Sequence, residues 1–380
     1  MRKGIDIIHK YRDLLAGKRL GLITSISGVD NQLNSTIEIL HSNFQLEALF
    51  GPEHGVRGDR TAGQPVEDDT DPVTGVPVYS LYREDSKGIS KDRLSKLDAV
   101  IYDIQDLGVR YYTFISTLLY AMRDCAEAGI QFIVLDRPDP LGGDILEGNV
   151  LEPEYQSFVG AYPLPVRYGL TVGELALMVN EEQKLGCDLI VIPCEGWNRK
   201  EMFPQTGQIW VMPSLGIPRF ETALLYPGTC LLEGTNLSEG RGTSCPFELL
   251  GAPFIDAQEL TKQLRQKRLA GVDFTPAYFT PTSSKYQGVP CNGVHLHLTD
   301  FLAFESYRTG IVIIETIRDL YPREFEFLRP QGQSAKPFIS LLSGNNVFES
   351  SQWTSELILK HNEQGLEEFR QKKQKYHIYD

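Results

Sequence analysis

The segment DAVIYDIQDLGVRYYTFISTLLYAMRDCAEAGIQFIVLDRPDP, residues 98–140, predicts a complete strand–helix–strand unit. Residues 98–104 and 131–135 are almost continuously apolar, as in strands that are buried on both faces of a sheet. Between them, Leu118, Leu119 and Met122 fit helical spacing, and Gly129 marks the end of the helix. The segment therefore predicts two parallel strands with a helix between them.

The same alternation continues on both sides of this unit. Strands are predicted in RLGLIT (residues 19–24), LEALF (46–50) and CDLIVIP (187–193). Ser35 and Thr171 are each followed three residues later by Glu, which is the spacing of a capping box and predicts two helix starts. We therefore predict an α/β fold, built on a parallel sheet that is covered on both faces in the manner of doubly wound proteins.

The pattern changes in the last part of the chain. Glycine-rich loops replace the strand–helix alternation, and VHLHLTD (residues 294–300) alternates like a strand with one polar face. At 380 residues the chain also exceeds the size at which a single core keeps growing. We expect a larger domain at residues 1–222 and a smaller α+β domain at residues 223–380.

Composition and charge narrow the class of protein. The formal net charge of −13 argues against a general nucleic-acid binder and against a protein that binds anionic membranes. The first 24 residues lack the apolar core of a signal peptide, and no apolar run is long enough for a membrane helix. We expect a cytoplasmic protein that binds neither nucleic acid nor membrane.

Cysteine and histidine usage gives little sign of a metal site. The six cysteines are scattered without a C-x-x-C pair, which favours buried free thiols over a metal or disulfide framework. His295 and His297 alternate along the predicted strand, and a polar strand face is a commoner reason for that spacing than a metal pair. We expect neither a metal nor another cofactor.

Charged side chains follow three of the predicted strands. Because ligands of parallel sheets bind beyond the carboxyl ends of the strands, we expect these side chains to face one crevice. They are Glu53, His54 and Arg57 after the strand at 46–50, Asp103, Gln105, Asp106, Arg110, Tyr112 and Thr113 after the strand at 98–104, and Arg137 after the strand at 131–135. In the second domain, EGTNLSEGRGT (residues 233–243) adds a polar loop with Asn236, Glu239, Arg241 and Thr243.

Glu53 is the candidate for chemistry, because Pro52 and the neighbouring glycines hold it in a stiff loop. A carboxyl group fixed in a cleft among other acids suits cleavage of a glycosidic bond. Arg57, Arg110, Arg137 and Arg241 suit bidentate capture of a substrate carboxylate, whereas His54 suits an orienting or hydrogen-bonding role. Two alternatives remain open, a non-catalytic binder of carboxylated sugars and a hydrolase that uses a carboxylate-bound metal.

Eight ordered motifs resemble the NamZ family of exo-β-N-acetylmuramidases from about residue 18 to the C-terminus. They include FGPEHGVRG (50–58), YDIQDLGVRYYTFISTLLYAM (102–122), VLDRPDPLGG (134–143) and YPGTCLLEGTNLSEGRGTSCPFELLGAP (226–253). The resemblance implies a Rossmann-like first domain, a smaller second domain and an active cleft between them. It also implies release of N-acetylmuramic acid from the non-reducing end of peptidoglycan-derived saccharides, as in cell-wall recycling.

The resemblance assigns Glu53 as the acid/base, with His54 and Asp106 as further candidate catalytic residues. Asp103, Asp106, Glu239 or the acetamido group of the substrate are candidates for the second catalytic group. The substrate-binding residues that it implies are Arg57, Asp103, Gln105, Arg110, Tyr112, Thr113, Arg137, Asn236, Glu239, Arg241 and Thr243. The chain departs from the family pattern at Ser25, Asp139, Tyr168, Leu215 and Gly216, which bears on fine specificity.

Overall fold

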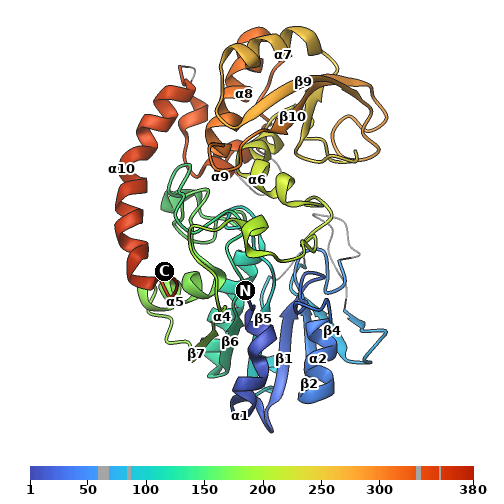
Figure 1. Ribbon diagram of the computed structural model, residues 1–380, viewed down its shortest axis with the longest axis vertical. Helices are drawn as coiled ribbons and strands as arrows, with labels where there is room; N and C mark the ends of the chain where they lie inside the picture. The colour runs from blue at the N-terminus through green and yellow to red at the C-terminus, as the bar shows by residue number, and fades with distance from the viewer. Residues whose placement is uncertain (59–67, 84–86, 331–334, 351) are drawn as a thin grey trace.

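A seven-stranded sheet forms the centre of the first part of the chain (Figure 1). The computed structural model describes residues 1–58, 68–83, 87–330, 335–350 and 352–380. The strands are β1 (Arg19–Thr24), β2 (Gln45–Gly51), β3 (Asp69–Thr70), β4 (Pro77–Ser80), β5 (Ala99–Asp103), β6 (Gln131–Leu135) and β7 (Leu189–Ile192), in the order β3-β4-β2-β1-β5-β6-β7. β3 pairs antiparallel with β4, and the other neighbours pair in parallel. The predicted α/β fold and the five predicted strands of this part are confirmed.

Successive residues of each strand point to opposite faces of the sheet and enter two separate cores. Helices cover both of these faces. Phe50, Tyr102 and Phe132 belong to one core, whereas Leu49 and Ile101 belong to the other. The first core is covered by α4 (Phe114–Ala128) and α5 (Val172–Glu182), and the second by η1 (Gly4–Tyr11) and α2 (Thr36–Asn43). Two short helices lie on opposite faces: α3 (Lys91–Leu94) contributes to the first core and α1 (Arg12–Leu15) to the second.

Local sequence signals explain where these helices begin and end. Thr171 forms the predicted capping box with Glu174, and Gly129 ends α4 in the left-handed conformation at φ 68°. At α2, Ser35 accepts a hydrogen bond from the N–H of Ile37, so Ser35 caps the helix without the reciprocal bond from Glu38. The predicted helix starts are therefore correct, although only one capping box is complete.

A smaller antiparallel sheet, β8-β10-β9, lies in the second part of the chain (Figure 1). Its strands are β8 (Leu249–Ala252), β9 (Val272–Phe279) and β10 (Cys291–Leu298). The helices of this part are α6 (Phe220–Thr229), α7 (Ala257–Gln266), α8 (Ser306–Leu320), α9 (Phe338–Ser343) and α10 (Ser355–Lys373). Short 3-10 helices are η2 (Pro153–Tyr155), η3 (Phe203–Thr206), η4 (Cys230–Gly234), η5 (Val347–Glu349) and η6 (Gln374–Tyr376). Among the described residues, no helix is long and apolar enough to cross a membrane.

Two helices, α6 and α10, link the two parts of the molecule. The predicted boundary between residues 222 and 223 lies inside α6, so the exact division into domains stays a prediction. α10 runs back beside the first part of the chain, and the C-terminus lies near α5 (Figure 1). There Lys373 donates to the carbonyls of Gly143 and Gly169 at 2.5 and 2.8 Å, and Tyr379 donates to Asp136. The last residues of the chain therefore hold the loops that follow β6.

Candidate active site

Glu53 lies in a tight turn directly after β2. The N–H of Gly55 donates to the carbonyl of Pro52 at 2.9 Å, and both His54 and Gly55 have positive φ, at 77° and 75°. The hydroxyl of Thr113 donates to Glu53 Oε2 at 2.7 Å. Thr113 immediately precedes α4, so the carboxyl group of Glu53 lies beside the start of that helix. The structure thus brings together residues 53 and 113, which follow different strands.

His54 is buried beneath this turn rather than turned outward. Its ring packs edge-on against Phe114, with ring centroids 6.4 Å apart and planes at 89°. A non-glycine residue with positive φ is strained unless its surroundings hold it, and this aromatic contact does so. The position fits the predicted orienting role of His54 better than direct contact with a substrate.

Two tyrosines, Tyr82 and Tyr112, lie close enough to Glu53 for its charge to affect their pKa values. Burial, together with the negative charge of Glu53, raises the pKa of Tyr82 to about 12. Burial also raises the pKa of Tyr112, with further contributions from Asp106 and Glu53, whereas the positive charge of Arg241 lowers it. The Tyr112 hydroxyl lies 3.0 Å from Ser214 Oγ. Glu53 and Arg241 therefore both lie close enough to Tyr112 for their charges to act on its hydroxyl.

The second glycine-rich loop contributes a compact group of opposite charges. Arg241 donates from Nε to Glu233 at 2.9 Å, and Lys285 Nζ lies 2.9 Å from Glu239 Oε2 in an ion pair. Burial raises the pKa of Glu233, while the positive charge of Arg241 opposes this effect. The side chain of Arg241 remains 29% exposed, whereas Lys285 Nζ also donates to the carbonyls of Leu232 and Thr235 at 2.8 and 3.0 Å, so Arg241 is the more accessible cation. This group offers positive charge to an anionic ligand.

Two predicted binding residues of the same loop bond to the protein itself. Thr243 Oγ1 donates to the carbonyl of Gly240 at 2.6 Å, and Asn236 donates to the carbonyl of Glu324 at 2.7 Å. These bonds fix the shape of the loop. Thr243 and Asn236 therefore stabilise the loop, whereas Arg241 is partly exposed to solvent.

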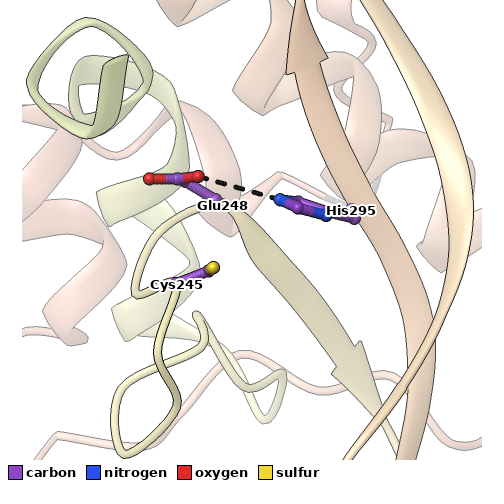
Figure 2. Close-up of side chains that lie close together, drawn as sticks. All are labelled: Cys245, Glu248 and His295. Carbon is purple, nitrogen blue, oxygen red and sulfur yellow. Dashed lines mark ion pairs between the residues drawn. The ribbon is translucent and has the colours of Figure 1, made fainter. Parts of the chain in front are cut away.

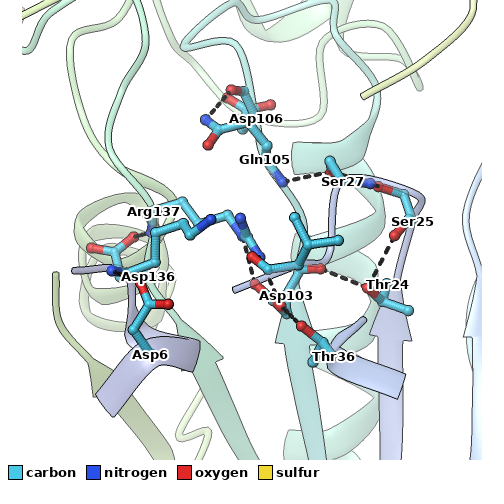
Figure 3. A network of polar contacts seen from close by, with 12 residues as sticks. Asp6, Thr24, Ser25, Ser27, Thr36, Asp103, Gln105, Asp106, Asp136 and Arg137 are labelled. Carbon is cyan, nitrogen blue, oxygen red and sulfur yellow. Dashed lines mark hydrogen bonds and ion pairs between the residues drawn. The ribbon is translucent and has the colours of Figure 1, made fainter. Parts of the chain in front are cut away.

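Asp103 and Arg137 form a buried ion pair at the ends of β5 and β6 (Figure 3). Arg137 donates to both carboxylate oxygens, at 2.6 Å from Nε and 2.9 Å from Nη2, and Thr36 donates to Oδ2. The side chains are 0% and 3% exposed, respectively. Both residues lie at the predicted edge of the sheet, but their charges neutralise each other and join the ends of β5 and β6 to the start of α2.

Gln105 and Asp106 lie on the same loop, and both are enclosed (Figure 3). The side-chain amide of Gln105 donates to the carbonyls of Asp106 and Pro138, at 2.8 and 3.0 Å. Asp106 accepts from the hydroxyl of Tyr168 and from the N–H of Gly108, yet burial raises its pKa to about 6. The Asp106 carboxyl therefore titrates close to neutral pH. Its partner Tyr168 is one of the residues at which the chain departs from the family pattern.

The two remaining predicted arginines have protein partners. Arg110 is fully buried and donates to the carbonyls of Asn149, Leu164, Leu342 and Ser343 at 2.6 to 2.8 Å. Its guanidinium is therefore not presented to the cleft but joins the loops after β6 to the end of α9. Arg57 pairs with Asp71 at 2.8 Å and keeps 32% of its side chain exposed. Among these arginines, Arg57 and Arg241 are the ones with an exposed guanidinium.

Pattern analysis missed several members of the site. Tyr82 and Ser214 were not predicted, whereas Glu233 belongs to the predicted polar loop at residues 233–243. Lys285, in PTSSKYQG (residues 281–288), could face the same crevice, but its sequence favours a plain turn. The acids around Glu53 do not form a group with three ligand atoms close enough to share an ion, within the residues that the structure describes. The geometry thus supports a carboxylate-based site with exposed cations opposite it.

Comparison with known proteins gives matches along almost the whole chain. Residues 20–221 match the family model of the N-terminal part of exo-β-N-acetylmuramidase NamZ, and residues 224–379 match that of the C-terminal part. A curated relative, the peptidoglycan β-N-acetylmuramidase NamZ of Bacillus subtilis (strain 168), is 48% identical over 385 residues. The match covers 100% of this chain and 91% of that protein.

Two crystal structures of DUF1343 family proteins from Bacteroides fragilis NCTC 9343 have the same fold. One superposes with a TM-score of 0.90 at 38% sequence identity, and covers 100% of this chain and 99% of the other. The second has a TM-score of 0.76 at 30% identity, with the same coverage. The two-part architecture is therefore shared with proteins whose structures are known from experiment.

Proposed function

The chain belongs to the exo-β-N-acetylmuramidase NamZ family and is a glycoside hydrolase of bacterial peptidoglycan, and from this premise we propose that Glu53 is its general acid. The observation that supports this role most is the hydrogen bond from Thr113, which fixes the Glu53 carboxyl beside the start of α4. A general acid must be held within hydrogen-bond reach of the leaving oxygen. The turn after β2 and Thr113 together restrict both ends of this side chain.

The reaction is hydrolysis of the β-1,4 bond of a non-reducing terminal N-acetylmuramic acid, as in MurNAc-GlcNAc. Glu53 protonates the oxygen that leaves with GlcNAc, while positive charge develops on the muramic acid ring. Asp103 accepts bonds from Arg137 and Thr36, and Asp106 accepts bonds from Tyr168 and Gly108. Glu239 is likewise buried and paired with Lys285 at 2.9 Å, so the substrate's own acetamido group is the favoured candidate to act on the opposite side of the ring.

We assign recognition of the lactyl carboxylate to Arg241. Its guanidinium is partly exposed, lies close enough to Tyr112 to influence that hydroxyl, and already bonds a carboxylate at Glu233. A planar guanidinium with several N–H donors is suited to share its fork between Glu233 and a substrate carboxylate. Lys285 adds a second positive charge through its contact with Glu239.

The test is hydrolysis of two isomeric disaccharides that differ in which sugar is at the non-reducing end. We expect the purified protein to release free N-acetylmuramic acid from MurNAc-GlcNAc and to leave GlcNAc-MurNAc intact. Conversion of the lactyl carboxylate of MurNAc-GlcNAc to its amide is expected to raise KM, because the charge facing Arg241 is lost. Equal hydrolysis of both disaccharides would contradict the exo specificity, and an unchanged KM for the amide would contradict the role of Arg241.

A further inference from the structure

We propose that Cys245, Glu248 and His295 form a binding site for one Zn²⁺ ion in the second sheet, separate from Glu53. Each residue offers one ligand atom, and the three atoms lie within 4.8 Å of one another. Figure 2 shows the three side chains turned toward one point between the turn before β8 and the strand β10. Within the described residues, no other group of three metal-ligand side chains comes this close.

The donor set is one that zinc prefers. Zinc sites in proteins combine cysteine sulfur, histidine nitrogen and carboxylate oxygen, commonly in tetrahedral geometry with bonds of about 2.0 to 2.3 Å. Tetrahedral bonds of that length separate the donor atoms by about 3.3 to 3.8 Å, so a shift of roughly 1 Å closes the site. Cys245 and His295 are half-buried, which leaves room for a water molecule as the fourth ligand.

The backbone holds the three residues in place. The N–H groups of Glu248 and Leu249 donate to the carbonyl of Cys245 at 3.2 and 3.1 Å, which closes a turn and brings residues 245 and 248 to one side. His295 pairs with Leu249 across the β8–β10 ladder, and Leu296 donates to the carbonyl of Glu248 at 3.0 Å. Ligands on a turn and an adjacent strand are positioned before any ion arrives, which favours binding.

Glu248 is ready to act as a ligand even though it has other partners. Its carboxylate accepts hydrogen bonds from Arg219 and Thr222. Arg219 bonds Oε1 from Nε at 2.9 Å and Oε2 from Nη2, whereas His295 Nε2 lies 3.7 Å from Oε2, beyond hydrogen-bond distance. Since the Arg219 side chain is 51% exposed, it can leave Oε2 to the ion and keep its bond to Oε1.

The proton balance of binding is simple. Zinc takes the thiolate form of cysteine, so Cys245 releases one proton to solvent as the Zn–S bond forms. Binding therefore releases this proton, and the affinity for Zn²⁺ depends on pH.

The site lies next to, but outside, the proposed active site. The N–H of Cys245 donates to Thr243 Oγ1 at 3.1 Å, so the turn that carries the thiol continues the loop of Arg241. Bound zinc would tie this loop to β10 and raise the thermal stability of the second sheet. This consequence does not depend on Glu53 or on hydrolysis.

The experiment is titration of tag-free, chelator-treated full-length protein with Zn²⁺ by calorimetry, and with Co²⁺ by absorption spectroscopy. We expect one ion per chain, a sulfur-to-cobalt charge-transfer band in the near ultraviolet, and a higher melting temperature with Zn²⁺. Cys245→Ser and His295→Ala should each weaken Zn²⁺ binding by at least about tenfold, and Cys245→Ser should abolish the band. The matched control is His361→Ala, which removes an exposed imidazole of α10 and should bind normally.

Three results would overturn the proposal. They are the absence of Zn²⁺ binding by folded wild-type protein, unchanged affinity in both ligand variants, and a bound Co²⁺ ion without the sulfur band. Circular dichroism of each variant confirms that it is folded. Hydrolysis of MurNAc-GlcNAc, measured on the same samples, reports on the proposed function separately.

Discussion

Replacement of Arg137 by Ala is expected to destabilise the fold rather than to weaken substrate binding. Arg137 and Asp103 are 3% and 0% exposed, and two charge-assisted hydrogen bonds of 2.6 and 2.9 Å join them. The substitution leaves the Asp103 carboxylate buried, with Thr36 as its remaining side-chain donor. Breaking a buried pair by removing one partner costs about 3 to 5 kcal/mol, because an uncompensated charge stays in the interior.

The assay is urea unfolding followed by circular dichroism, together with kcat and KM for MurNAc-GlcNAc at a temperature where each variant is folded. Arg19→Ala is the matched control, since Arg19 also forms a two-bond pair, with Asp98, but both side chains are about 40% exposed. That exposed pair is worth about 0 to 1 kcal/mol. Adding Asp103→Ala to Arg137→Ala should recover part of the loss. A free energy of unfolding for Arg137→Ala that matches the Arg19→Ala value, combined with a raised KM, would refute the structural role.

Three further substitutions test other parts of the account. Thr113→Val removes the 2.7 Å hydrogen bond to Glu53, and we expect it to lower kcat by about ten- to a hundredfold with little loss of stability. The control is Thr316→Val, which removes a hydroxyl hydrogen bond within α8 and should leave kcat unchanged. Arg110→Lys should lower the melting temperature without changing KM, because an ammonium cannot bond the four carbonyls that the guanidinium reaches; a raised KM at unchanged stability would speak against this. Burial raises the pKa of Asp139 to about 8, so the folded chain holds a proton that the unfolded chain releases above about pH 4, and stability falls as pH rises toward 8. Asp139→Asn should remove this loss, and its gain in melting temperature over wild type should be larger at pH 8 than at pH 5; an equal difference at both values would contradict the prediction.

The sheet was predictable because its strands are buried on both faces. Continuous apolar runs such as residues 19–24 and 131–135 leave few alternatives to parallel strands, and the observed strands match these bounds. The return of the C-terminus to α5 was not predictable. It depends on single contacts, such as that of Lys373 with Gly143, which no local pattern encodes.

The site was predictable in its location but not in the role of each residue. Strand ends place charged residues at one edge of a sheet, and the contact between Glu53 and Thr113 agrees with that expectation. A sequence does not tell which charges neutralise each other, so Arg137 with Asp103, and Arg110 with its carbonyl partners, looked equivalent to the exposed Arg241. Burial decides between these roles, and burial of an arginine follows from the whole fold.

The ligands of the proposed zinc site could not be predicted from local sequence either, because they are far apart in the chain. The pattern V-H-L-H-L directs attention to His295 and His297 as a pair, but the imidazole of His297 bonds Thr275 at 2.7 Å. The ligand partners of His295 lie about fifty residues earlier in the chain and reach it through the antiparallel register of β8 and β10. Register of this kind is set by the hydrophobic pattern of several strands together, so spacing within one strand does not reveal it.

The role of Glu53 as the general acid is tested by comparing wild type with Glu53→Gln, at matched thermal stability, on two substrates. One substrate is MurNAc-GlcNAc, whose leaving sugar needs a proton, and the other is an aryl β-glycoside of MurNAc with an acidic phenol as the leaving group. If Glu53 is the general acid, turnover of the disaccharide should fall by at least about a hundredfold, while turnover of the aryl glycoside should fall far less. Equal losses on both substrates, or full activity of Glu53→Gln on the disaccharide, would contradict the assignment.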